Sequence, residues 1–276
     1  MRDTLPHEGR PRRRGGATVG IIKSTTAGHQ QLFFFERDQP YEQARALSAQ
    51  YNEARPFPHI VIDDFLSVDL IEHILASFPA KEDASVLRTQ PYAYLKRGYR
   101  PDDLAVNVSR HHLYLFNTAP MLEWLEHLTG MRGLIPDPYF SGGGFHEIDR
   151  GGRLGVHTDF NLYSKLNLIR RINLLLYLNN DWRPEYGGNL ELWNADVTAC
   201  IKSIEPLFNR CVIFYTDKRA FHGHPDALAC PDTRTRRSIA IYYYSAPVTT
   251  IAATDDVNER TDYRARPGTN DVPALR

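Results

Sequence analysis

The chain has 276 residues, of which 42% are hydrophobic and 24% are charged, as is typical of a globular protein with a sizeable core. Lys plus Arg and Asp plus Glu are equal at 33 each, so no global field favours nucleic acid or a membrane surface as a partner. The sequence shows neither the apolar run of a secretory signal nor the roughly 20 apolar residues of a transmembrane helix. We therefore expect a cytoplasmic protein.

The three cysteines, Cys200, Cys211 and Cys230, are odd in number and follow no C-x-x-C spacing. This pattern argues against a disulfide framework and against a thiolate zinc site. We expect three reduced thiols with structural roles.

The first half of the chain predicts helices around one strand. Residues 1–35 are basic, rich in Gly and without apolar periodicity, which predicts a flexible extension. Residues 38–54 predict a helix with Asp38 as its cap, 59–62 a short strand, and the segment after Ser67 an amphipathic helix. The apolar face of that second helix comprises Leu70, Ile71, Ile74, Leu75 and Phe78.

Residues 80–111 are polar and irregular, and they predict either a long surface loop or a segment that covers a site. A further helix is predicted after Pro120, with Gly130 as its stop. Its apolar face comprises Met121, Leu122, Leu125 and Leu128.

Residues 139–244 have a different pattern, with short apolar runs such as RINLLLYLN, CVIFYT and RSIAIYYYS between turn-rich pieces. This alternation predicts an all-β module of about 100 residues. The tail, 246–276, lacks periodicity, and we expect it to be mobile. The prediction is therefore one domain over 36–245, with a β core at 139–245 and helical support at 36–138.

The segment GVHTDF places His157 and Asp159 two positions apart. On a strand, side chains at i and i+2 point the same way, so both can reach one metal ion, and a distant His on a neighbouring strand must complete the set. Two imidazoles and one carboxylate on one face are the ligands of non-haem Fe(II) oxygenases. A second His-x-Asp occurs at His224 and Asp226, but no histidine follows it in the chain. A distant later histidine that could complete three ligands is therefore available only to the first pair.

The third ligand is therefore His222 or His224. His222 follows the strand-like run CVIFYT by a short turn, whereas His224 lies beside Pro225 in a predicted loop. We favour His222. The alternative is an ordinary hydrogen-bonded pair of His157 with Asp159 and a surface turn at residues 222–224.

Side chains of two predicted strands are expected to form the rest of the pocket. In RRSIAIYYYS, Arg236, Ser238, Ala240 and Tyr242 share one face, and Arg237, Ile239, Ile241 and Tyr243 share the other, which is suited to packing. A guanidinium at a barrel mouth can grip a carboxylate with two parallel bonds, so Arg236 is the candidate for the C5 carboxylate of 2-oxoglutarate, unless it is a surface Arg in TRTRR. In RINLLLYLNN, alternation places Arg171, Asn173, Leu175 and Tyr177 together, and we expect Tyr177 and Asn173 to contact the co-substrate.

Taken in order, H157-T-D159, RRINLLLYLNNDW, EYGGNLELW, PLFNRCVIF, FH222GHP and R236RSIAIYYYS resemble the catalytic domain of prolyl 4-hydroxylase-like Fe(II)/2-oxoglutarate dioxygenases of bacterial type. The resemblance covers residues 139–245, and PFPHIVIDDFL with LTGMRGLIPDP resembles the N-terminal half of bacterial members, which extends it to residues 56–245. It implies a mainly β fold with flanking helices, a double-stranded β-helix (jelly roll, cupin-like). It also implies His157, Asp159 and His222 as metal-ligating catalytic residues, Arg236 and Tyr177 toward 2-oxoglutarate, and Fe(II), 2-oxoglutarate, O2 and, optionally, ascorbate as cofactors.

The implied activity is oxidation of an unactivated C–H bond of a small molecule or peptide, without nucleic acid or membrane as a partner. Several peptidyl-prolyl hydroxylases carry a Tyr where this chain has Glu147, so peptidyl-proline specificity is only one of the readings. A non-catalytic β-barrel binding module and a zinc-dependent hydrolase are the alternatives outside this family. The substrate and the oligomeric state are left open by the sequence.

Overall fold

The structure is a computed structural model that describes residues 17–18, 22–27, 30–35, 39–104, 108–247, 258–269 and 271. The helices are α1 (Gln39–Asn52), α2 (Val68–Ala76), α3 (Val108–Leu115) and α4 (Ala119–Thr129), with short 3-10 turns η1 (Lys81–Asp83), η2 (Pro101–Asp103) and η3 (Pro184–Tyr186). Within the described residues no helix is long and apolar enough to cross a membrane.

The strands form one large curled sheet and one separate pair. The large sheet contains β1 (Ala17–Thr18), β4 (His59–Asp63), β5 (Val86–Gln90), β6 (Ala93–Tyr99), β7 (Ile135–Pro136), β8 (Gly144–Thr158), β9 (Leu162–Tyr163), β10 (Leu168–Tyr177), β11 (Leu190–Trp193), β12 (Cys200–Ile204), β13 (Cys211–Tyr215), β14 (His222–His224), β15 (Arg236–Ser245) and β16 (Asp262–Tyr263). The separate pair is β2 (Ile22–Ala27) with β3 (Gln30–Phe35).

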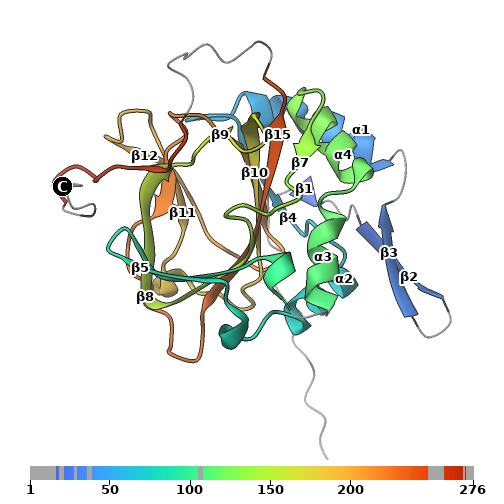
Figure 1. Ribbon diagram of the computed structural model, residues 1–276, viewed down its shortest axis with the longest axis horizontal. Helices are drawn as coiled ribbons and strands as arrows, with labels where there is room; N and C mark the ends of the chain where they lie inside the picture. Colours follow the sequence, from blue (N-terminus) through green and yellow to red (C-terminus); the bar gives the residue numbers. More distant parts are fainter. Residues whose placement is uncertain are drawn as a thin grey trace, which may run out of the picture.

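The large sheet is mainly antiparallel, with the strand order β1-β4-β13-β10-β15-β8-β14-β11-β12, and it closes around an interior (Figure 1). The pairing of β8 with β14 connects the part of the sheet from β1 to β8 with the part from β14 to β12. The fold is thus the expected mainly β jelly roll, and the four helices all lie on one side of it.

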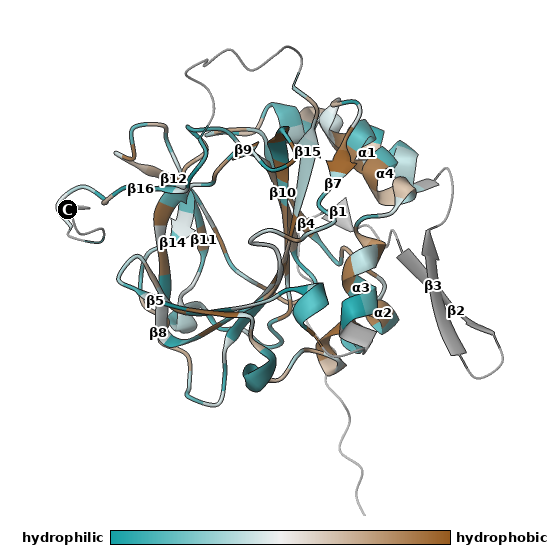
Figure 2. Cartoon of the chain, viewed as in Figure 1, coloured by the Kyte–Doolittle hydropathy of each residue, from teal (hydrophilic) through white to brown (hydrophobic). Residues whose placement is uncertain are grey.

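Because side chains alternate along β10 and β15, one face of these strands packs in the main core and the other lines the interior. Ile172, Leu174 and Leu176 point outward with Ile239 and Ile241, and they form the main core with the helices, including Trp124 of α4 and Leu70 of α2. The apolar colouring where helices meet the sheet shows this layer (Figure 2). The opposite face of the same strands points into the interior, where polar side chains gather.

The helix predictions are largely confirmed. Leu70, Ile71 and Ile74 of α2 are buried, and Ser67 is its N-cap, although its side chain makes no capping bond. In α4, Met121, Leu125 and Leu128 are buried and Gly130 ends the helix with φ 76°. The proposed cap of the first helix, Asp38, lies outside the described residues.

The structure decides between the alternatives for residues 80–111 and changes the prediction for the tail. Among the described residues of that segment, β5 and β6 form a hairpin, and β6 pairs with β8 alongside the interior, which agrees with the covering alternative. In the tail, the described residues 258–269 include β16, which pairs with β8 at Thr158 and His157. Much of the basic extension lies outside the described residues, although β1 to β3 fall within it or at its end.

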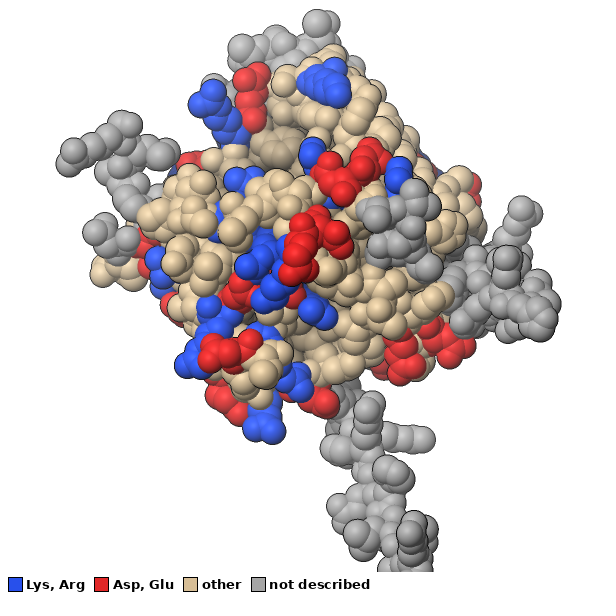
Figure 3. Space-filling view, turned by 60° about the horizontal axis from the view of Figure 1, so that its bottom comes forward, with Lys and Arg blue, Asp and Glu red and all other residues tan. Residues whose placement is uncertain are grey.

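Charged side chains of both signs are intermixed on the surface in Figure 3, in keeping with the equal numbers of basic and acidic residues. The three cysteines are free thiols, with Cys211 and Cys230 buried and Cys200 exposed.

Candidate active site

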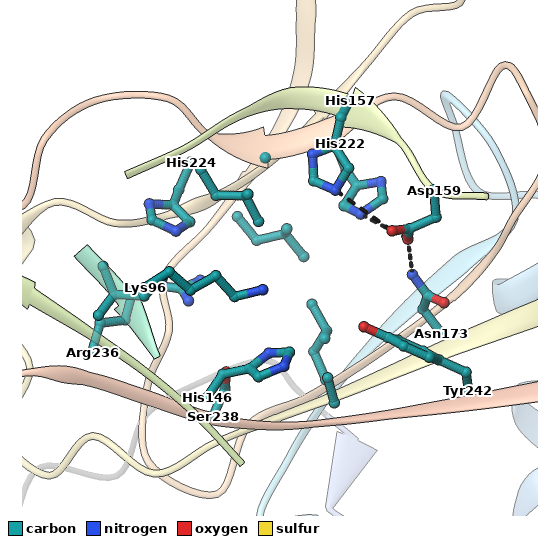
Figure 4. Close-up of a pocket in the computed structure, with 16 residues that line it drawn as sticks. Lys96, His146, His157, Asp159, Asn173, His222, His224, Arg236, Ser238 and Tyr242 are labelled. Atoms are coloured by element: carbon teal, nitrogen blue, oxygen red, sulfur yellow. Dashed lines mark hydrogen bonds and ion pairs between the residues drawn. The ribbon is translucent and has the colours of Figure 1, made fainter. Parts of the chain in front are cut away.

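The end of β8 and the start of β14 bring three metal-binding side chains together. His222 is directly opposite His157 across the two antiparallel strands, so their side chains project from the same face. Asp159 follows just after β8 ends, two positions from His157. The Nε2 atoms of His157 and His222 lie 3.6 and 3.4 Å from the Asp159 carboxylate oxygens (Figure 4). All three ligand atoms lie within 4.8 Å of one another.

Backbone carbonyls orient both imidazoles. Nδ1 of His157 donates to the Gly155 oxygen at 2.8 Å, and Nδ1 of His222 donates to the Ala220 oxygen at 2.9 Å. With Nδ1 protonated, the lone pair of each ring is on Nε2, which faces Asp159. Two neutral imidazoles and one carboxylate converging in this way are the donor set of a non-haem Fe(II) site, so the residues fit that ion.

Asp159 is held in its ionised form by two buried side chains. Arg170 donates to its Oδ2 at 3.0 Å and Asn173 donates to the same oxygen at 2.7 Å. Burial raises the pKa of Asp159, but the positive charge of Arg170 outweighs this effect and holds the pKa well below its usual value. An ionised carboxylate is the form that binds a metal.

Asn173 therefore lies in the pocket as expected, but its amide contacts the carboxylate of Asp159. Its neighbour Arg171 does not share this face, which corrects the alternation assumed for β10. A register shift between Arg170 and Ile172 turns Arg170 inward, where it lies 3.4 Å from the centre of the Tyr242 ring. Arg171 instead donates to Ser245. A bulge of this kind leaves no mark in the sequence pattern.

Arg236 lies at the other end of the same cavity and is only 5% exposed. Its Nε donates to the Gly188 carbonyl at 2.7 Å, and its Nη2 is 3.3 Å from the hydroxyl of Tyr177. No carboxylate of the described residues lies within ion-pair distance of it. Burial without a counter-ion lowers the pKa of Arg236. A buried guanidinium in this state strongly favours an anionic ligand.

Gly188 makes room for this arrangement. Its φ is 73°, and a Cβ on it would lie 2.9 Å from Cδ of Arg236 and 2.5 Å from Leu228. The EYGGN motif thus builds the support on which the Arg236 side chain lies. Tyr177 is fully buried behind Arg236, and it contacts the guanidinium without lining the cavity.

The face assignment of β15 is confirmed. Arg236, Ser238, Ala240 and Tyr242 all line the cavity. Arg237 points the other way, where it donates to Glu147 at 3.0 Å.

Two sequence interpretations about neighbouring positions are wrong. His224 is not in a loop: it belongs to β14, is 3% exposed and lines the cavity, and among the described residues neither of its ring nitrogens has a hydrogen-bond partner. Glu147 is not a pocket residue: it is buried on the opposite face of β8, where it accepts from Tyr99 and Thr235. Of the neighbouring residues His146 and Glu147 on β8, His146 is the one that lines the pocket.

Two further residues at the site were missed. Lys96 of β6 extends into the centre of the pocket, between Arg236 and the His-Asp-His group (Figure 4). Tyr263 of β16 stacks on the ring of His157, with centroids 5.1 Å apart and planes 29° apart. Both come from segments without clear periodicity, so only the sheet pairing reveals their position.

The comparisons with known proteins agree with this geometry. Residues 143–244 match the family model of the 2OG-Fe(II) oxygenase superfamily. This match identifies residues 143–244 as a 2OG-Fe(II) oxygenase domain, and prolyl hydroxylases are among the proteins that the chain resembles. This domain contains Arg236 and every residue of the His-Asp-His group.

Among the proteins that the chain resembles, mouse (Mus musculus) prolyl 3-hydroxylase OGFOD1 is 27% identical over 200 residues, 70% of this chain and 34% of that protein. The chain thus spans about a third of the length of that relative.

Two solved structures share the fold. A prolyl hydroxylase from Trichoplax adhaerens, in complex with a hypoxia inducible factor peptide fragment, has a TM-score of 0.52 at 16% identity and covers 75% of this chain and 91% of its own. A Pseudomonas putida prolyl-4-hydroxylase has a TM-score of 0.51 at 17% identity and covers 74% of this chain and 100% of its own. These relatives support neither a zinc hydrolase nor a non-catalytic binding module.

Proposed function

We propose that this protein is an Fe(II)- and 2-oxoglutarate-dependent dioxygenase that oxidises an unactivated C–H bond of a small molecule or peptide. One observation carries the proposal: the buried guanidinium of Arg236, which has no counter-ion among the described residues, shares a cavity with the group formed by His157, Asp159 and His222. A zinc hydrolase needs the three ligands but has no use for a buried cation at the far end of the pocket.

His157, Asp159 and His222 would hold Fe(II), and Arg236 would bind the C5 carboxylate of 2-oxoglutarate with the Tyr177 hydroxyl beside it. When bound, the iron and 2-oxoglutarate supply the oxidation of the substrate with O2, and succinate and CO2 are released. The protein positions these groups and limits access of water. Arg170 and Asn173 are positioning residues, because they fix the Asp159 carboxylate.

The substrate proposed here is a small molecule or a peptide. Peptidyl proline is the narrower candidate, since the mouse relative is a prolyl 3-hydroxylase and the Trichoplax structure contains a peptide. We further propose that residues 36–245 act as one catalytic domain. The free thiols of Cys200, Cys211 and Cys230 are consistent with a reducing, cytoplasmic location.

Turnover of the co-substrate tests the activity without a known substrate. Protein reconstituted with Fe(II) should convert 2-oxoglutarate slowly to succinate only when O2 is present, and His157→Ala should abolish this conversion. Ascorbate should prolong it if uncoupled turnover oxidises the iron. Succinate formation equal in wild type and His157→Ala would refute the proposal.

A further inference from the structure

A second cavity opens in front of the metal-binding side chains and adjoins the first. It has a volume of about 570 Å³ and is lined by His157 and Asp159 at its base. Its other walls come from the β5–β6 hairpin, the turn at residues 141–142, β10, β15 and the segment around β16. Cavities of roughly 300 to 1,000 Å³ are the size that small ligands occupy. On the proposed function, this cavity is where the substrate would approach the iron.

Four basic side chains line this cavity, but two of them are already paired. Arg170 is bonded to Asp159 at 3.0 Å, and Arg100 is bonded to Asp103 at 2.6 Å. The acidic residue at the rim, Asp262, lies 3.4 Å from Arg264.

The other two basic residues are Arg88 and Lys96. Neither has a carboxylate within ion-pair distance among the residues that the structure describes. The cavity therefore presents two basic groups that form no ion pair within the described residues, and the charge of Asp159 acts favourably on Lys96.

Both of these side chains come from the same hairpin. Arg88 lies on the exposed strand β5, and Lys96 on β6 reaches into the pocket (Figure 4), and both line the cavity that contains Asp159. They also line a smaller adjoining cavity together with Arg100. Burial and the nearby charge of Arg88 lower the pKa of Lys96 to about 8. A negatively charged group placed between Arg88 and Lys96 would stabilise the charged form of Lys96, and so oppose both its burial and its repulsion by Arg88.

The remaining walls are aromatic. Tyr92 and Tyr263 are in contact with centroids 4.3 Å apart, and Tyr263 in turn stacks on His157. Phe160 and Tyr242 line the same cavity. Such rings offer flat apolar surface to the body of a ligand, while the cations of the hairpin select its charge.

We infer that the primary substrate is a compact molecule with an anionic group, a carboxylate or a phosphate, which Arg88 and Lys96 bind beneath the β5–β6 hairpin while the aromatic walls hold its apolar body near the iron. This inference rests on the proposed function and names the class of its substrate. The guanidinium of Arg88 can form two parallel bonds to either oxyanion, and Lys96 adds a point charge.

Binding of matched probe pairs tests this inference without turnover. The full chain, loaded anaerobically with Fe(II) and saturating 2-oxoglutarate so that the Arg236 end is filled, is titrated calorimetrically with benzoate or benzamide, and with phenyl phosphate or phenol. At least one anion should bind at least about tenfold more tightly than its neutral partner. Preference for benzoate or for phenyl phosphate identifies the oxyanion.

Substitutions of the basic residues show which side chains bind the anion. Arg88→Gln and Lys96→Gln should each weaken anion binding by about tenfold, whereas Arg132→Gln, which removes an exposed Arg outside the cavity, should leave it unchanged. Anion binding that is equal in wild type and Arg88→Gln, or neutral partners that bind as tightly as the anions, would overturn the inference.

The same samples separate this inference from the proposed function, because 2-oxoglutarate is titrated first. Normal 2-oxoglutarate binding in wild type and Arg88→Gln, combined with no preference for the anions, would refute only the substrate class. Absence of 2-oxoglutarate binding in the wild type would refute the dioxygenase assignment itself, and the substrate inference with it.

Discussion

His157 and His222 face each other across β8 and β14, with ring centroids 4.5 Å apart. This closeness depends on Gly223, because a Cβ at that position would lie 2.6 Å from the Gly155 carbonyl oxygen on β8. Only a residue without a side chain lets the two strands approach this closely at the metal ligands.

Gly223→Ala should therefore push β14 away from β8 and misplace His222. We expect Fe(II) affinity to fall by about 10- to 100-fold, as when the surroundings of a metal ligand are disturbed. Anaerobic equilibrium dialysis measures it. Gly98→Ala on β6 is the control, since its new Cβ would meet His146 at an ordinary 3.7 Å. Unchanged iron binding in Gly223→Ala would show that the strands can separate without cost to the site.

Arg236→Lys should weaken binding of 2-oxoglutarate and leave Fe(II) affinity nearly unchanged. Lysine keeps the charge but loses the bond to Gly188 and the planar fork, and loss of a charged hydrogen bond corresponds to roughly 10- to 150-fold in affinity. Arg237→Lys is the matched control, because that side chain binds Glu147 outside the cavity. Greater damage from Arg237→Lys would contradict the orientation of β15.

His224→Leu should retain iron but bind 2-oxoglutarate more weakly. The imidazole lines the cavity beside Arg236 and has no hydrogen-bond partner in the described part of the chain, so it is available to the co-substrate. We expect a severalfold to tenfold increase in the dissociation constant, the loss of about one hydrogen bond. Titration calorimetry measures it, with His222→Leu, which should lose iron, as the comparison. Loss of iron in His224→Leu would mean that the third ligand has been misassigned.

Binding of benzoate should depend on pH through Lys96. The pKa of Lys96 is lowered to about 8, so its positive charge is present below that pH and is lost above it. Affinity should thus be highest below pH 8 and fall as the pH rises through 8 and beyond, while benzoate itself stays ionised. The charged or titratable groups that interact with Lys96 include Arg88, His146, Asp159, Arg170, His224 and Arg236.

Lys96→Arg supplies the control for that profile, because its guanidinium stays charged throughout the range. Its benzoate affinity should be nearly constant from about pH 6.5 to 9.5. A profile in Lys96→Arg that falls as in the wild type would assign the titration to another group.

Sequence periodicity predicted the parts of this site that follow strand alternation. His157 and Asp159 are two positions apart at a strand end, and the inward face of β15 begins at Arg236, so both could be placed without a structure. Alternation failed at Arg170, where a bulge turns the chain, and it could not have located that residue.

Pairing between strands that are far apart in the sequence explains why other site residues were not predicted. Lys96 and Tyr263 reach the site because β6 and β16 add to β8, and neither segment has a pattern that specifies its partner strand. His224 was placed in a loop because Pro225 follows it, yet β14 extends to the residue just before the proline. A proline directly after a strand is compatible with the extended conformation of the residue before it.

The formation of the complex with both Fe(II) and 2-oxoglutarate tests the central claim most directly. Under anaerobic conditions, adding 2-oxoglutarate to the Fe(II)-loaded protein should produce a saturable metal-to-ligand charge-transfer absorption. His157→Ala and Asp159→Ala should not produce it, and Arg236→Lys should reach it only at about 10- to 150-fold higher 2-oxoglutarate. Absence of the band in wild type, or its persistence in His157→Ala, would contradict the assignment of this cavity as an iron and 2-oxoglutarate site.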